Sequence, residues 1–140
     1  MSDIFTNTEN ALKLVFGAGT LATNVYTGIS AETLLPPYVV CSCNRADEHP
    51  PYSNNYNTEV EIFVVSAADD GLGAHQTRVG AVRSIMGSGT IAADLTSYGT
   101  DYHAFGAHTL RLSPTVFDAD ERLWSTTLGL SIYSCAKDIS

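Results

Sequence analysis

The chain has 140 residues, which is enough for one self-supporting core. Its hydrophobic fraction of 44% excludes an intrinsically disordered chain. Its formal net charge is −8 at pH 7, which disfavours a general nucleic-acid-binding surface, since such a surface needs clustered Lys and Arg. We therefore expect a single globular domain over residues 1–140.

The first predicted element is an N-terminal helix. Thr6 and Glu9 have the spacing of a capping box, with Thr6 as the N-cap, although Ser2 or Asp3 could also begin the helix. Glycines at positions 17 and 19 end it. The apolar side chains that follow the cap at helical spacing are Ala11, Leu12, Val15 and Phe16.

Two strand candidates come next. Residues 21–26 favour a short strand, with a helical turn as the alternative, because they are rich in Thr, Val and Tyr. A connection over residues 28–35 leads to a strand over residues 38–43. Residues 44–57 are polar, and they are predicted to form an exposed loop that is long enough to have a function of its own.

The clearest strand covers residues 58–66. Apolar and acidic side chains alternate along it, Val60, Ile62 and Val64 against Glu59 and Glu61. Phe63 and Val65 make the second face apolar as well, so the far end of this strand is expected to be covered on both sides.

A central helix is predicted over residues 74–86, with Asp69 and Asp70 as possible capping carboxylates before it. Glycines at 87 and 89 end the helix. Its apolar stripe has spacings of three and four: Val79, Val82, Ile85 and Met86. The residues placed mostly off this stripe are His75, Gln76, Arg83 and Ser84. Residues 91–97 fit a short helix or an irregular segment.

The last third of the chain is typical of a β-hairpin. Its first strand is expected over about residues 108–117, its turn over residues 118–121 and its second strand over residues 122–135. The alternating apolar face of the second strand is Trp124, Thr126, Leu128, Leu130 and Ile132. The order of elements predicts an α+β fold, in which the N-terminal and central helices pack on a mainly antiparallel sheet.

The cysteines favour free thiols. Cys41 and Cys43 would point to one side of a strand and could share a metal, but zinc sites usually have two to four residues between cysteines and a second pair. Packing of two small side chains is the preferred interpretation. Cys135 makes the count odd, and residues 1–20 lack a basic start before an apolar run, so we expect a reducing compartment.

No catalytic constellation is recognisable. None of the serines lies in a G-x-S-x-G elbow, and the acidic residues before the central helix would repel a phosphate. The acidic segment 118–121 lacks the later Gly and Glu of a calcium loop and is interpreted as a turn. No apolar run approaches the roughly 20 residues that span a bilayer. The pattern favours a soluble assembly protein, without a cofactor or a membrane, over an enzyme.

The whole layout resembles that of the tail-terminator or tail-completion proteins of long-tailed bacteriophages. The features that carry the resemblance are an N-terminal helix ending near Phe16, a short segment over 24–28, an extended segment over 35–40, a strand over 59–65 that leads into the helix around Val82, and a late hairpin over 110–132.

This resemblance implies a hexameric ring in the virion, seated on the last ring of tail-tube subunits and assembled in the host cytoplasm. The other face of the ring would meet head-completion or connector proteins, and DNA would pass through the lumen without specific binding. An acidic surplus would suit such a bore. Another neck component, such as a head–tail adaptor, or a tail-tube subunit is the alternative within this class.

Subunit or partner contacts are expected at the polar loop and at the hairpin turn. The loop combines Tyr52 and Tyr56 with amides, the composition of a binding surface, although an ordinary solvated connection explains it equally well. The full predicted contact set is Asn44, Arg45, Tyr52, Asn54, Asn55, Tyr56, Asp118, Asp120 and Glu121. A hypothesis of another class is a small cytoplasmic enzyme or ligand-binding domain, with a pocket near His103, His108 and Cys135.

Overall fold

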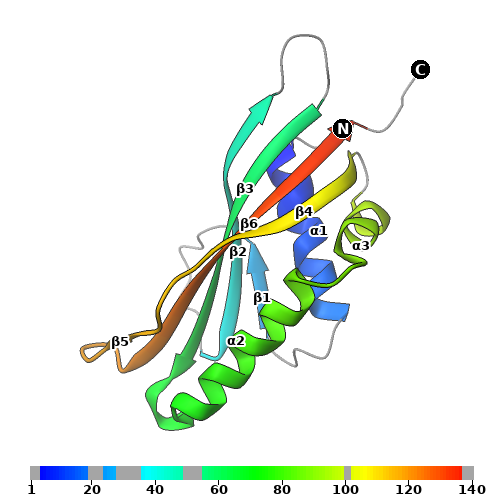
Figure 1. Ribbon diagram of the computed structural model, residues 1–140. Coiled ribbons are helices and arrows are strands. Elements are labelled where there is room, and N and C mark those ends of the chain that lie inside the picture. Colours follow the sequence, from blue (N-terminus) through cyan, green and yellow to red (C-terminus); the bar gives the residue numbers. More distant parts are fainter. Residues whose placement is uncertain (1–3, 19–23, 28–35, 49–54, 100–101, 137–140) are drawn as a thin grey trace.

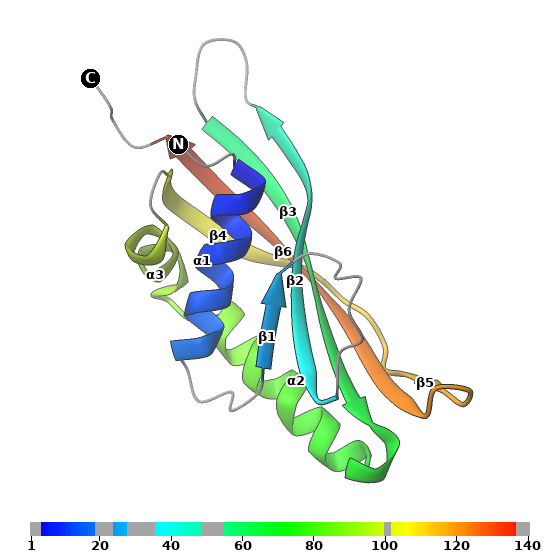
Figure 2. The same cartoon turned by 180° about the vertical axis from the view of Figure 1, so that it is seen from behind.

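In the described part of the chain, six strands form one sheet and the helices pack on one of its faces (Figures 1 and 2). The computed structural model describes residues 4–18, 24–27, 36–48, 55–99 and 102–136. The elements are α1 (Ile4–Ala18), β1 (Asn24–Thr27), β2 (Tyr38–Glu48), β3 (Asn55–Ala67), the 3-10 turn η1 (Ala68–Asp70), α2 (Leu72–Met86), α3 (Ile91–Tyr98), β4 (Tyr102–Leu112), β5 (Val116–Asp118) and β6 (Leu123–Ala136).

The sheet has the order β1-β2-β3-β6-β4, and β5 pairs with β6 beyond the end of β4. β1 and β2 are parallel, whereas the other pairs are antiparallel. The predicted α+β class is therefore confirmed, with α1 and α2 packed on a mainly antiparallel sheet. Among the described helices, none combines the length with the apolar character that crossing a bilayer requires.

The core lies between the helices and one face of the sheet. The alternation in the two longest strands determines this face, because side chains two residues apart point the same way. Eight strand residues of the core are at most 1% exposed: Val39, Cys41, Val60, Ile62, Val64, Leu128, Leu130 and Ile132. On the opposite face Phe63 is half-buried and Val65 is buried. The prediction that both faces of β3 are covered at its far end is therefore confirmed at Val65.

The start of α1 differs from the prediction. The helix already includes Ile4, so Thr6 is not its N-cap, and Ser2 and Asp3 lie outside the described residues. The Glu9 carboxylate accepts a hydrogen bond from the amide of Cys43, with 2.8 Å between N and Oε2. The pairing of β1 with β2 ends at Cys41, two residues before Cys43. The Glu9 carboxylate therefore satisfies a backbone N–H of β2 that lies past the end of β1. A tertiary contact therefore uses the carboxylate that the spacing assigned to a local cap.

The predicted loop over residues 44–57 is wrong at both of its ends. β2 continues through residues 44–48 and β3 begins at residue 55, with pairing as far as Glu48 and Tyr56. The register shifts between Cys43 and Arg45, which makes Asn44 a bulge residue. Backbone hydrogen bonds hold an antiparallel pair, and polar side chains do not prevent them. Residues 49–54 of the predicted loop lie outside the described residues.

The central helix α2 is confirmed, with two corrections. Asp69 and Asp70 do not cap it, because Gly71 is the N-cap and no side chain accepts a hydrogen bond there. The two carboxylates instead form ion pairs with Arg122 and Arg78. His75 does not lie off the apolar stripe: it is fully buried, since it precedes Val79 by four residues and so continues the stripe.

The hairpin is confirmed in its second strand and revised in its first. β4 begins at Tyr102, six residues before the expected start, and ends at Leu112. Pro114 lies in the break between β4 and β5, where a residue without a backbone N–H cannot continue a ladder. The amide of Ser113 still donates to the carbonyl of Thr127, at 3.0 Å, and keeps the broken edge attached to β6.

On the sheet face opposite the helices, an arginine reaches across a glycine. Gly129 of β6 lies between Glu61 of β3 and Arg111 of β4 in the register. Arg111 and Glu61 form an ion pair at 3.6 Å. A Cβ at position 129 would lie 3.0 Å from Cγ of Arg111, so the absent side chain is what lets the arginine cross β6.

Gly129→Ala should displace the side chain of Arg111. Within a strand, alanine in place of glycine usually raises the free energy of unfolding by about 0.5 kcal/mol, and the displacement should cancel this gain. The exposed ion pair itself contributes less than about 1 kcal/mol, so the net change should be a small destabilisation. In the Arg111→Ala background the same change at 129 should be neutral or stabilising. Urea unfolding of the four proteins of this double-mutant cycle measures the coupling, and additive effects would contradict the crossing.

Candidate functional site

Exposed apolar side chains gather along the β4–β5 edge of the sheet. Of the nine large hydrophobic residues that are exposed in the described ranges, five lie between residues 105 and 117. We call this set the apolar edge: Phe105, Leu110, Leu112, Val116 and Phe117. Exposed apolar side chains that gather in one region of a surface commonly mark a contact surface.

Two β-bulges lie in the β4 part of the apolar edge. The pairing of β4 with β6 skips Phe105 and then Leu110, so both side chains leave the regular alternation. β4 is also the last strand of the sheet order, with β5 continuing the same side of β6. Bulges at an edge discourage a further strand from pairing along it. The edge therefore favours contact through side chains over extension of the sheet.

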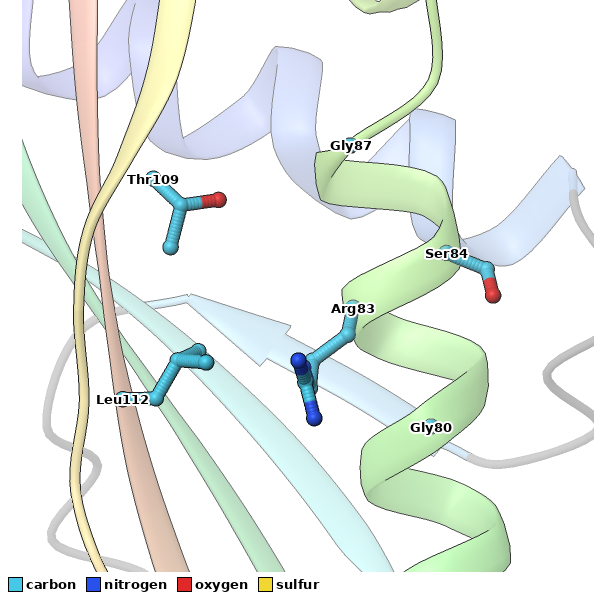
Figure 3. A pocket seen from close by; sticks show the side chains of 6 residues that line it. All are labelled: Gly80, Arg83, Ser84, Gly87, Thr109 and Leu112. Atoms are coloured by element: carbon cyan, nitrogen blue, oxygen red, sulfur yellow. The ribbon is translucent and has the colours of Figure 1, made fainter.

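A groove lies beside this edge, between α2 and β4. Its volume is about 550 Å³, and its lining comes from α2 and from the end of β4: Gly80, Arg83, Ser84, Gly87, Thr109 and Leu112. In Figure 3 the side chains of Arg83, Thr109 and Leu112 are directed into the space between helix and strand, whereas Ser84 points away. At Gly80 a Cβ would meet no atom within 4 Å, so a glycine on α2 contributes to the hollow.

Arg83 is the charged group of the groove. The four other arginines each pair with a carboxylate: Arg45 with Asp47, Arg78 with Asp70, Arg111 with Glu61 and Arg122 with Asp69. For Arg83 no carboxylate lies within ion-pairing distance in the part of the chain that the structure describes. In a chain of net charge −8, an arginine without an acidic neighbour is a distinct feature of this surface.

The predicted contact residues separate into two groups at opposite ends of the sheet. Asn44, Arg45, Asn55 and Tyr56 belong to the β2–β3 end, whereas residues 118–121 lie at the β5–β6 turn (Figure 1). Asn55 pairs with residue 135 of β6 and Asp118 with residue 123. Twelve residues of strand separate these positions, about 40 Å at the usual rise. The structure therefore does not bring the predicted set together.

At the β2–β3 end, the side chains of Arg45 and Tyr56 have contacts within the chain. Arg45 forms an exposed ion pair with Asp47, with 2.9 Å between Nε and Oδ2. The ring of Tyr56 packs edge-on against Tyr102, with centroids 5.8 Å apart. The other predicted residues of this end include Tyr52 and Asn54, which lie outside the described residues.

At the opposite end, the segment between β5 and β6 is the predicted turn. Oδ1 of Asp118 accepts hydrogen bonds from the amides of Asp120 and Glu121, at 3.0 and 3.1 Å. All three side chains are exposed. Within the described ranges, the carboxylates of Asp120 and Glu121 lack a cationic partner. We call residues 118–121 the acidic turn.

A buried polar network lies under the N-terminal half of α2. The ring of His75 contacts the hydroxyls of Ser66 through Nδ1 and Thr126 through Nε2, both at 2.8 Å. Arg78 donates to Ser66 Oγ at 2.8 Å, and Thr115 contacts Thr126 at the same distance. Burial, followed by the nearby charge of Arg78, lowers the pKa of His75. A neutral ring, protonated on Nε2, can accept from Ser66 and donate to Thr126.

This network joins elements and does not form a catalytic dyad. Ser66 and His75 are 0% exposed, so no substrate can reach the hydroxyl. The contacts hold α2 against β3 and β6. Nearby, Nε1 of Trp124 is a buried donor without a hydrogen-bond partner among the described atoms.

Among the described residues, the thiols and the histidines other than His75 are not arranged as a metal site. Cys41 and Cys43 are both buried in the core, and burial raises the pKa of Cys41, so its thiol stays protonated. His103 pairs with Cys135 in the register, while the exposed ring of His108 stacks on Tyr133. Across the described residues no cluster of three His, Cys, Asp or Glu side chains could hold a metal ion.

Comparison with known proteins gives one kind of match. No protein-family model matches the chain, and no curated protein does. The fold is similar to that of a chain in the solved structure titled "Virion of native gene transfer agent (GTA) particle", with a TM-score of 0.69. The alignment covers 96% of this chain and 99% of that chain, at 17% sequence identity. The two chains share a fold.

The apolar edge and the groove were not predicted as contact surfaces. The alternation of Leu110 and Leu112 against Arg111 indicated a strand, but it did not indicate that the strand ends the sheet. The bulges that expose Phe105 and Leu110 arise from pairing with β6 and have no local sequence signal here. The groove depends on the distance between α2 and β4, which only the fold determines.

Proposed function

We propose that this chain is a structural protein of a phage-like virion. In this proposal it forms a ring at the tail apex, ends the tail tube and joins the tail to the head connector. The observation that carries the proposal is the shared fold with a chain of a gene transfer agent virion, over nearly the full length of both chains. In this proposal residues 1–140 form a single domain.

The surface of the chain supports assembly over catalysis. The apolar edge exposes large side chains in a protein whose core is otherwise well covered. Ring subunits meet head to tail, so each copy must carry two different contact surfaces. The apolar edge with its groove is one candidate and the acidic turn is another. In this proposal the protein catalyses no reaction, binds no cofactor and is assembled in the host cytoplasm.

The proposed ring also has to let DNA pass. A formal net charge of −8 repels the phosphate backbone, which reduces adhesion to a lumen. The tail-tube protein and the head-completion or connector proteins are the proposed partners on the two faces of the ring.

The test is the assembly state of the purified protein. Native mass spectrometry at tens of micromolar should give one closed ring, with six copies as the expected number. Electron microscopy of the same sample should show single rings, since a terminator stops after one layer. Long tubes would instead indicate a tail-tube subunit, and a persistent monomer would contradict the proposal.

The composition of purified particles gives an independent test, which also distinguishes a tail terminator from a head–tail adaptor. Peptides of this chain should be found in purified virions, in a number consistent with one ring per particle. Particles made without the protein should have tails of uncontrolled length if it terminates the tube, whereas loss of an adaptor should leave tails of normal length detached from heads. Absence of the protein from the virion would exclude both roles.

A further inference from the structure

We propose that the acidic turn of one copy docks in the α2–β4 groove of the next copy, with Asp120 and Glu121 against Arg83. This inference rests on the proposed ring and assigns the two surfaces through which neighbouring subunits meet. The contact is heterologous, because the turn and the groove are different parts of the same surface.

Charge complementarity identifies the occupant of the groove. Arg83 lacks an acidic partner in the described part of the chain, while Asp120 and Glu121 lack a cationic one. Two copies that each carry −8 repel one another overall. A contact that places cations of one copy against anions of the other offsets this repulsion, and among the described residues Arg83 is the arginine that no carboxylate engages.

The apolar groups around these charges also match. Leu112 lines the groove and is 46% exposed. Val116 and Phe117 lie on β5, directly before the acidic turn, and are exposed as well. Docking would bury these side chains against one another around the ion pairs. The groove volume of about 550 Å³ is within the range of pockets that enclose small ligands, so it can receive the side chains of a turn.

The turn cannot fill the groove of its own chain. Leu112 pairs with Leu128 of β6, whereas Asp118 pairs with Leu123. Five residues of extended strand separate these partners, about 17 Å. Because β5 is hydrogen-bonded to β6, the turn is held away from the groove and points outward from the end of the sheet (Figure 1). An acidic turn that fills the groove therefore has to come from a second copy.

The test is a charge reversal on each side of the contact. Arg83→Glu should weaken self-association at least about tenfold, since it places like charges in the groove. The double substitution Asp120→Arg/Glu121→Arg should have a similar effect. A chain that carries all three changes should recover the ring, because the pairing is restored with reversed signs. Sedimentation velocity over a concentration series measures all four proteins.

Two controls make the result specific. Lys13→Glu changes the charge equally on the exposed side of α1 and should leave assembly unchanged. Thermal unfolding should give similar Tm values for all variants, since the changed side chains are exposed. If the wild type forms a ring and Arg83→Glu does so equally well, the docking is wrong while the ring proposal stands. If the wild type stays monomeric, the ring proposal itself fails.

Discussion

Replacing Phe16 with alanine should lower the free energy of unfolding by about 3–5 kcal/mol, the usual cost of removing a buried aromatic side chain. Phe16 is 0% exposed and belongs to the core between α1 and the sheet. Its loss leaves a cavity where α1 packs on β1, β2 and α3. Chemical denaturation, followed by circular dichroism, measures the change.

The matched control is on the same helix. Leu14 is 49% exposed, and Leu14→Ala should change the free energy of unfolding by no more than about 0.5 kcal/mol. The difference between these two variants isolates burial from helix propensity, because both introduce alanine into α1. Equal effects would mean that α1 is not packed on the sheet as described.

Replacing His75 with alanine should cost about 2–4 kcal/mol. Two hydrogen bonds of about 1 kcal/mol each are lost and a cavity forms under α2. Ser66 and Thr126 each keep one other partner, Arg78 and Thr115, which limits the penalty. Urea unfolding at pH 8 gives the value, and Gln76→Ala at the neighbouring exposed position is the control.

The same histidine predicts a pH dependence. The pKa of His75 is lowered in the folded state, so the unfolded chain binds more protons below its ordinary pKa of about 6.5. Its stabilising contribution is complete above that pH and declines as the pH falls through it. The difference in free energy of unfolding between wild type and His75→Ala should therefore decrease from pH 8 to pH 5. A constant difference would contradict a neutral, buried ring.

The strands with strict alternation could be predicted from the sequence. Val60, Ile62 and Val64 in β3 and the matching residues of β6 are buried as expected, because a period of two determines which face meets the helices. The helix α2 was predicted from its stripe, although its start was placed two residues late. These signals are local, and the fold did not override them.

Features that depend on pairing could not be predicted in this way. The polar residues 44–48 are strand only because β3 lies alongside them. The hydrogen bonds of His75 could not be predicted either, because its partners Ser66 and Thr126 are 9 and 51 residues away in sequence. The groove depends on the fold more than any other feature, since Arg83 and Leu112 line it together only because α2 packs beside β4.

The position of β6 inside the sheet has a consequence for biosynthesis. β6 lies between β3 and β4 and supplies partners to both, although it is the last of the described strands along the chain. Until translation passes residue 136, β3 has a bare edge along thirteen residues, from Asn55 to Ala67. A nascent or prematurely ended chain would expose that edge to neighbouring polysomes, where unpaired strands aggregate. The sheet can therefore close only after β6 has been made, and chaperone capture before that point should raise the yield of assembled protein.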